Sequence, residues 1–350
     1  MPQIPEAGAA AASILLDLVG MKSLTAIAIS FGLITGSVSL SADTHRFVPA
    51  MFHDTISTEH PPALRLKSGD RVTTTATEHL VGPFYVEGAE PGDLLVVAIE
   101  TLKPSATTGF STSIMVSNSV DPGSLTSRPD PTRFPWTIDP DRGVVRLDLH
   151  SVSRTTDWNS RFANPVFEMP LEPRLRAIGV APSTPQSGNL IASGVGAGAK
   201  AMLPVFHEGA LLYLGRGQAR QGDGDVTGAG IEAPLDVEFS VEVVKKKEWP
   251  HSSVVRPSTV VGEFEMGSPR VETTDYLMAV ASAPSLQEAL QHATIELHHW
   301  LDDDFGLSEK TVSIFVGQAM EYEIASISGP AATVVAKVRK AYLPAAADAR

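Results

Sequence analysis

The segment Pro61–Glu78 reads PPALRLKSGDRVTTTATE, and its apolar and polar residues alternate on both sides of a turn at Ser68-Gly69-Asp70. Alternation has the period of a strand with one buried face, so this segment predicts β structure interrupted by the turn. The next segment, Gly82–Leu102, places a second turn at Glu90–Asp93 before another apolar run. The region that follows Phe47 is therefore expected to be built from strands.

Further short apolar segments continue this pattern towards the C-terminus. They are Gly143–Leu149, Arg176–Pro182, Lys200–Phe206, Gly209–Gly215 and Leu235–Val244. Residues 103–140 are rich in Ser, Thr, Pro and Asp, and they predict long loops. Dense turns between short strands favour a β-sandwich or a barrel.

The pattern changes near Pro284. Ser285 and Glu288 form a capping box, and apolar residues then recur at helical spacing as far as Trp300. A second helix is predicted from Ser308 to about Gln318, and a strand is predicted within Ala331–Pro344. The predicted fold is mainly β, a β-sandwich or a barrel, with a C-terminal α+β element. We expect a β-rich region at 43–245 and the α+β region at 246–350.

The composition excludes several classes of protein. The chain has 350 residues, of which 43% are hydrophobic and 19% charged, as in a globular protein with ample core material. Its 40 acidic and 27 basic side chains give a net charge of −13, which disfavours a nucleic-acid partner. It contains no cysteine, so thiolate nucleophiles, disulfides and cysteine metal sites are excluded.

Residues 1–42 are interpreted separately. Lys22 precedes an apolar stretch, Leu24–Ile34, which small residues follow as far as Ala42. This layout predicts a secretory signal peptide that starts at Met21 and is cleaved after Ser41 or Ala42. A buried helix or an uncleaved anchor is the alternative. We expect a secreted or periplasmic protein, with a cytoplasmic location as the alternative, and no stable membrane span after signal removal.

Several familiar motifs fail on their spacing. Gly194–Lys200 matches neither a phosphate loop nor a dinucleotide fingerprint, and Gly109–Ser113 lacks the second glycine of a nucleophile elbow. His298-His299 and Asp302–Asp304 fall on or just after the predicted amphipathic helix. That position favours a solvated helix end over a metal site.

The histidines and carboxylates of the predicted loops remain as candidates. His45, His53 and His60 gather in the sequence with Asp54 and Glu59, where a functional role competes with ordinary surface positions.

A second group of candidates lies further along the chain. The glycine-rich stretch Leu214–Asp225, LGRGQARQGDGD, is interpreted as a loop, and His207 lies in a turn shortly before it. Asp223 and Asp225 alternate with glycines, which allow close approach of the backbone to a ligand. Two carboxylates at this spacing can bind one cation or one water, although the same tripeptide also occurs in ordinary turns.

Taken in order, several segments resemble the acetamidase/formamidase family. They are Val81–Leu95, Ile178–Pro185, Ser187–Leu190, Leu203–Gly215, Gln221–Phe239, Pro269–Leu307 and Gly317–Ile324. The resemblance extends from about Phe47 to Pro344. It implies a mainly β fold, a β-sandwich plus a barrel-like part with a C-terminal α+β element. It also implies hydrolysis of small aliphatic amides to carboxylate and ammonia, and assembly into a homo-oligomer.

The resemblance also implies a metal site, from which this chain departs. The family's loop resembles Gly-Asp-x-His-Ala-x-Gln-Gly-Asp-x-Glu, whose Asp and His suit a divalent cation, and an Asp follows its Gly-Asn segment. Here these positions hold Arg216, Gln218 and Ile191, and the final Glu is Asp225. The cofactor is therefore unknown, and the family-like divalent metal site is expected to be lost. The flanking framework remains as Gly188, Asn189, Gln221, Gly222, Asp223 and Gly224.

Two functions follow from these residues. In the first, the protein is a divergent hydrolase of small linear amides, with Asp223 or Asp225 as the base and Asn189 and Gln221 orienting the substrate. The residues assigned to substrate binding are Arg216, Gln218, Gly188, Gly222 and His207. In the second, the protein is a catalytically silent ligand-binding or structural relative. Arg216 is expected to pair with Asp223 or Asp225, either to hold a carboxylate-bearing ligand or to stabilise an inactive site.

Overall fold

The computed structural model describes residues 42–121, 123, 132–152, 165–181, 195–246, 255–257 and 264–343. All of them belong to one compact unit, Leu40–Arg350.

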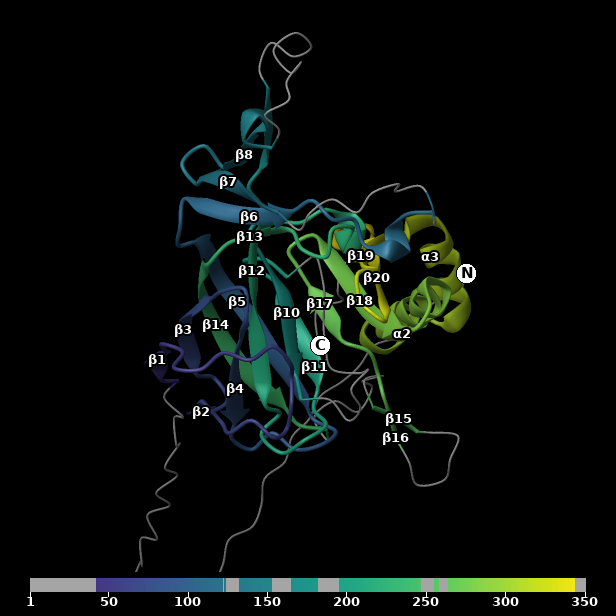
Figure 1. The fold of residues 1–350 in the computed structure, drawn as a ribbon. Helices are drawn as coiled ribbons and strands as arrows, with labels where there is room; N and C mark the ends of the chain where they lie inside the picture. The colour runs from purple at the N-terminus through teal and green to yellow at the C-terminus, as the bar shows by residue number, and fades with distance from the viewer. Residues whose placement is uncertain are drawn as a thin grey trace, which may run out of the picture. The chain divides into compact units, whose positions relative to one another are not determined.

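Most of the described strands lie in two nine-stranded sheets (Figure 1). The first sheet has the order β1 (Thr44–Arg46), β3 (Arg71–Ala76), β14 (Leu235–Val244), β5 (Leu94–Pro104), β11 (Lys200–Pro204), β17 (Arg270–Glu272), β18 (Tyr276–Ala283), β20 (Ala332–Arg339) and β19 (Glu321–Ser326). The second has the order β2 (Leu64–Leu66), β4 (Leu80–Val86), β12 (Leu212–Arg220), β13 (Ile231–Glu232), β6 (Thr108–Thr112), β7 (Arg133–Asp139), β8 (Val144–Asp148) and β9 (Val166–Pro170), and β10 (Arg174–Val180) pairs with β12. A separate two-stranded ladder joins β15 (Val255–Pro257) to β16 (Phe264–Met266).

The alternation in Pro61–Glu78 determines which side chains are buried. In β3, Val72, Thr74 and Ala76 are buried while the residues between them are more exposed, as the period of two predicts. The two strands of this segment do not pair with each other, because β2 joins the second sheet and β3 the first. The segment thus connects the two layers of a sandwich.

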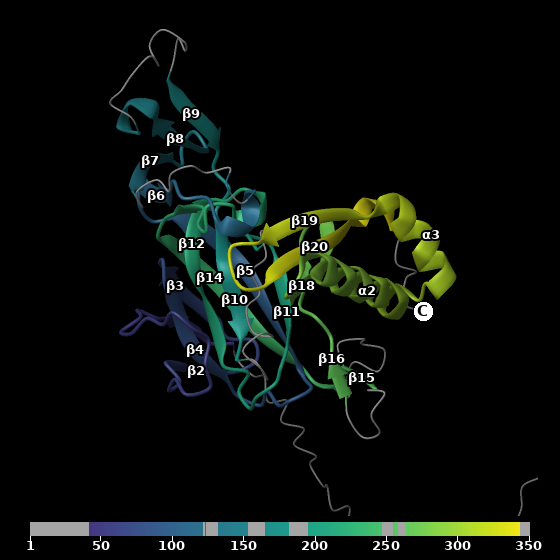
Figure 2. The ribbon, with the colours of Figure 1, turned by 45° about the vertical axis from the view of Figure 1, so that its right-hand side comes forward.

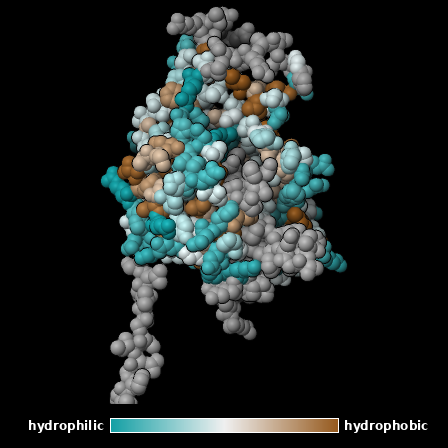
Figure 3. All heavy atoms as spheres, turned by 60° about the horizontal axis from the view of Figure 1, so that its bottom comes forward, coloured by the Kyte–Doolittle hydropathy of each residue, from teal (hydrophilic) through white to brown (hydrophobic). Residues whose placement is uncertain are grey.

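The main core lies between the two sheets. Phe84 of the second sheet packs edge-on against Phe239 of the first, with ring centroids 5.4 Å apart. Leu95 and Leu214, from opposite sheets, belong to the same fully buried cluster. Burial of each such side chain contributes roughly 1.5–3 kcal/mol to the stability of the fold. Figure 3 shows one face of the molecular surface. Hydrophilic and intermediate residues predominate among its coloured atoms.

The C-terminal helices begin and end as their sequence predicts. Ser285 caps α2 (Leu286–Phe305) by accepting the backbone N–H of Glu288, and Gly306 ends it with φ of 62°. Ser308 caps α3 (Glu309–Ala319). The buried face of α2, which includes Trp300, packs on β18 and β20 (Figure 2). The predicted mainly β fold with a C-terminal α+β element is confirmed.

Three expectations need comment. The described strands form open sheets, so the barrel-like part is not a closed barrel. The segment 103–140, which was predicted to form loops, contains β6 and β7. Trp136 and Ile138 occupy alternate positions of β7, and both side chains are buried in one apolar cluster. The boundary at 245/246 stays a prediction, and the first sheet continues across it. No helix among the described residues is long and apolar enough to cross a membrane.

Candidate functional site

The glycine-rich stretch is mostly strand. β12 runs through Leu212–Arg220, so the prediction of a loop over Leu214–Asp225 is wrong for its first seven residues. The glycines serve close packing of backbones: a Cβ on Gly215 would lie 2.2 Å from the carbonyl oxygen of His79, and one on Gly217 2.6 Å from that of Ala233. These glycines allow β12 to lie against neighbouring backbone where a side chain would collide.

The loop proper is a tight turn after β12. Asp223–Asp225 form one turn of 3₁₀ helix, in which Gly224 has φ of 80° and Asp225 φ of 52°. This geometry leaves Asp223 exposed and buries the Asp225 side chain completely. The backbone N–H of Ile327 donates to the carbonyl of Gly224 at 2.9 Å, which holds the turn against the β19–β20 connection.

Asp225 is bound from two sides. Arg176 of β10 donates to its Oδ2 atom, and the hydroxyl of Ser328 donates to the same oxygen at 2.9 Å. Arg176 also donates to Ser328 Oγ at 3.2 Å, and Ser326 Oγ lies 2.9 Å from Ser328 Oγ. The result is a connected group of a carboxylate, a guanidinium and two hydroxyls. The expectation that Arg216 pairs with Asp223 or Asp225 is wrong, because Arg176 occupies that role.

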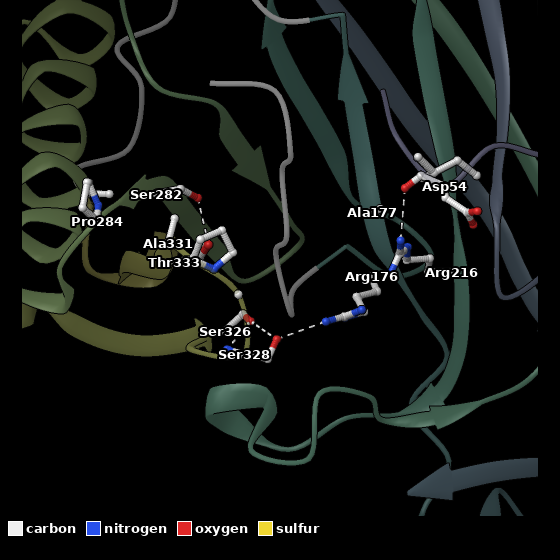
Figure 4. A pocket seen from close by; sticks show the side chains of 14 residues that line it. Asp54, Arg176, Ala177, Arg216, Ser282, Pro284, Ser326, Ser328, Ala331 and Thr333 are labelled. Carbon is white, nitrogen blue, oxygen red and sulfur yellow. Dashed lines mark hydrogen bonds between the residues drawn. The ribbon is translucent and has the colours of Figure 1, made fainter. Parts of the chain in front are cut away.

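A cavity of about 550 Å³ opens beside this group (Figure 4). Its walls come from β4, β10, β12, β18, β19 and β20, from the loop before β2, and from the connections that follow β18 and β19. They comprise Asp54, Leu80, Arg176, Ala177, Arg216, Ser282, Ala283, Pro284, Ser326, Ser328, Gly329, Pro330, Ala331 and Thr333. This volume is in the usual range of small-molecule sites.

Arg216 lines the cavity in an unusual backbone conformation. Its φ is 56°, which a residue with a side chain rarely adopts. Its guanidinium donates to the backbone carbonyl of Asp54 at 3.3 Å. Burial, and after it the charge of Arg176, lowers the pKa of Arg216.

Four further predicted residues lie outside the cavity wall. Gln218 and Gln221 are buried, and the Gln221 amide donates to the carbonyl of Ala325 at 3.2 Å. Gly222 is exposed, and His207 is half-buried in the turn before β12. None of these four lines the cavity. Gly188, Asn189 and Ile191 lie outside the described residues.

The N-terminal histidine group is a packing feature. His53 stacks on His60 with ring centroids 3.9 Å apart. His60 Nδ1 lies 2.9 Å from the Tyr213 hydroxyl, which itself donates to the carbonyl of Ser57. His45 contacts Asp70, at 3.0 Å. From that predicted group only Asp54 reaches the cavity wall.

Arg176 and Ser328 were missed by the sequence analysis. Arg176 lies in a segment that carries only a strand pattern, and Ser328 lies in a turn without a nucleophile motif. Their contacts with Asp225 span 49 and 103 residues along the chain. No local spacing signals such contacts.

The residues present do not fit the divalent cation that the family resemblance implies. No group of three or more His, Cys, Asp or Glu side chains suited to a metal occurs among the described residues. Asp225 is already paired with Arg176, and Arg216 adds a second guanidinium to the same wall. A cation about 4 Å from one guanidinium would be repelled by roughly 8 kcal/mol for a double charge at an effective dielectric of about 20.

Comparison with known proteins agrees with this fold. The sequence profile of the acetamidase/formamidase family matches residues 174–337. A protein of Schizosaccharomyces pombe named "Putative formamidase" is 27% identical over 222 residues, which cover 50% of this chain and 53% of that protein. The chain thus spans about half the length of that curated relative.

Solved structures share the fold. An acetamidase from Yersinia enterocolitica superposes with a TM-score of 0.70 at 21% identity, over 88% of this chain and 95% of that one. An acetamidase from Bacillus halodurans gives a TM-score of 0.66 at 23% identity, over 85% and 98%. The fold therefore defines the chain as a two-layer β protein with a C-terminal α+β element. The match over residues 174–337 and the curated relative support assignment to the acetamidase/formamidase family.

Proposed function

We propose that this protein hydrolyses the C–N bond of small linear amides in the cavity beside Asp225. The observation that supports it most is positional: every residue of the cavity wall except Asp54 and Leu80 falls within the segment 174–337 that matches the family. The relatives carry the names formamidase and acetamidase. The proposal assigns the activity in those names to residues of this chain.

Ser328 is the group that meets the substrate. Asp225 has no exposed side-chain surface, so it acts on the cavity only through the Ser328 hydroxyl that donates to it. As the Ser328 oxygen attacks the amide carbonyl carbon, its proton passes to Asp225. When the C–N bond breaks, Asp225 returns that proton past Ser328 Oγ to the departing nitrogen, which leaves as ammonia. Water then hydrolyses the acyl-serine ester to the carboxylate.

Arg176 supports this step electrostatically. Its guanidinium lies 3.2 Å from Ser328 Oγ, so a positive charge is fixed near the amide carbonyl, whose oxygen becomes negatively charged during the attack. Its ion pair with Asp225 keeps the carboxylate in position beside β10. Asp223, by contrast, is exposed, and of the two predicted bases Asp225 is the one retained in this proposal.

Ammonia release from formamide and acetamide tests the proposal. Ser328→Ala should lower kcat/KM by at least about 100-fold, the lower range for loss of a proton-transfer group. Ser282→Ala is the matched control, since Ser282 lines the same cavity but bonds to Thr333. Equal activity of Ser328→Ala and wild type would exclude this mechanism. No ammonia from any linear amide would favour the silent ligand-binding alternative.

Three further features belong to the proposal. The active site is divergent: Arg216, Gln218 and Ile191 stand at positions where the family resemblance implies metal ligands. The protein is exported as a secreted or periplasmic protein after removal of the signal peptide in 1–42. It assembles as a homo-oligomer, which sedimentation of the purified protein would test.

A further inference from the structure

The cavity is much larger than the smallest amides. Its volume is about 550 Å³. One water occupies about 30 Å³ of the liquid, so a molecule with four heavy atoms, such as acetamide, fills only a minor part. The remaining wall can therefore recognise a second part of a larger substrate.

That wall carries two arginines in register. β10 and β12 are antiparallel, with Leu175 opposite Gly217 and Ala177 opposite Gly215. These pairs flank Arg176 and Arg216 and place them opposite each other. Directly opposed like charges destabilise a sheet, so the pair needs anions nearby.

Only one of the two charges is balanced by a bonded carboxylate. Arg176 is paired with Asp225. Arg216 makes one long hydrogen bond, to the Asp54 backbone carbonyl, and no ion pair within the described part of the chain. The Asp54 carboxylate is 80% exposed and contacts His79 Nδ1 at 2.9 Å. A guanidinium has five N–H donors, so most of the Arg216 donors are available to a ligand.

The backbone of Arg216 supports the same conclusion. Arg216 has a φ of 56°, and such a value outside glycine persists mainly where the surroundings impose it, often at ligand sites. Here the conformation accompanies an irregular register between β12 and β4, just before Arg216. Protein burial also lowers the pKa of Arg216, so an anion bound beside it would relieve an unfavourable environment.

We infer that Arg216 binds the carboxylate of an anionic substrate, a short dicarboxylic acid of which one carboxyl group is an amide. The guanidinium matches a carboxylate through two parallel hydrogen bonds. The amide then extends across the cavity towards Ser328. The carboxylate half of the inference depends on the cavity alone, and the amide half rests on the proposed function.

Binding is tested apart from catalysis with dicarboxylates, which resemble the product. Malonate, succinate and glutarate are titrated into the intact protein by calorimetry, beside acetate and inorganic phosphate. At least one dicarboxylate should bind, and Arg216→Gln should weaken it at least tenfold. Arg216→Lys should recover part of the affinity, because it keeps the charge but loses the fork. Arg220→Gln is the control, since Arg220 lies on the same strand and pairs with Glu172 outside the cavity.

The outcomes separate the two proposals. Arg216-dependent dicarboxylate binding without any amide hydrolysis would support this inference and contradict the proposed function. Hydrolysis of neutral and anionic amides that is equally efficient in wild type and Arg216→Gln would overturn this inference and leave the proposed function standing. Phosphate that binds more tightly than every dicarboxylate, or dicarboxylate binding unaffected by Arg216→Gln, would also overturn it.

Discussion

Arg176 binds the fully buried carboxylate of Asp225 while its own side chain is only 11% exposed, so the pair is withdrawn from water on both sides. Desolvation makes such a pair expensive to assemble but also expensive to break. Because Arg176 lies on β10 and Asp225 follows β12, the pair fixes the turn that supports Ser328.

Loss of Arg176 should therefore destabilise the fold as well as the site. We expect Arg176→Gln to lower the free energy of unfolding by about 3–5 kcal/mol, the usual cost of leaving a buried charge unpaired. Urea unfolding measures it. The control is Arg142→Gln, which breaks an exposed pair with Glu168 and should cost less than about 1 kcal/mol. A similar small cost for both variants would contradict the importance of the buried pair.

The glycines of β12 make a steric prediction. Gly215→Ala should cost about 3 kcal/mol, the upper end of overpacking, because its Cβ would collide with backbone atoms of His79 and Leu80. Gly222→Ala is the matched control: nothing lies within 4 Å of its Cβ position and its φ is −84°. Its effect should stay within about 1 kcal/mol. Thermal unfolding of the two variants compares them, and equal losses would rule out the steric explanation.

The sequence predicts the fold better than the site because the two depend on different distances along the chain. Val72 in β3 is buried by a local period of two, and Ser285 caps α2 through a residue three positions away. Both signals are visible in the sequence. Ser328 meets Asp225 across 103 residues, so only the folded sheets bring them together.

The same reason explains the wrong partner assigned to Arg216. The sequence offered Asp223 and Asp225 as carboxylates close to Arg216 along the chain, yet Arg216 lies within β12 and its guanidinium donates to the carbonyl of Asp54. The pairing of β10 with β12 instead brings Arg176 to Asp225. The glycines of β12 indicated close packing of the backbone. The same pattern is expected whether the backbone approaches a ligand or, as at Gly215, the backbone of His79.

Asp70 predicts how stability responds to acid. Burial alone raises the pKa of Asp70, but hydrogen bonds from the backbone of Lys67 and Asp43 and from His45 outweigh it, so the pKa lies below its ordinary value. The stabilisation is therefore complete above the unfolded pKa of about 3.9 and is lost as pH falls below it, through the folded pKa.

The measurement is the free energy of urea unfolding from pH 7 to pH 3. Asp70→Asn should be less stable than wild type at pH 7, and the difference should shrink below pH about 4. His45→Gln removes one partner and leaves both backbone donors, so it should retain most of the effect. A difference that stays constant over the whole range would contradict the role of the Asp70 charge.

Export makes a prediction about the mature N-terminus. Cleavage after Ala42 would convert the backbone N–H of Asp43, which lies 3.0 Å from Asp70 Oδ1, into an ammonium group. That change would turn a hydrogen bond into a charge-assisted one. N-terminal sequencing of the protein made in its host should read from Ala42 or Asp43. Protein that begins at Met1 or Met21 would contradict export with cleavage.

The last prediction concerns metal content. We expect purified wild-type protein to hold no stoichiometric zinc or other transition metal at Gly215–Asp225, because Arg176 and Arg216 both oppose a cation at this wall.

The variant Ile191→Asp, Arg216→Asp, Gln218→His restores the ligand types that the family resemblance implies and removes one of the two arginines. Its affinity for a divalent ion should exceed that of wild type, and the single change Arg216→Asp should do less, since ligands act as a set. Adding Arg176→Gln releases Asp225 as a further ligand and should strengthen binding again. Elemental analysis and calorimetry measure these steps, with circular dichroism to confirm folding. One tightly held metal per wild-type chain that disappears in Asp225→Asn would refute the expectation, because the carboxylate would then serve a cation in spite of Arg176.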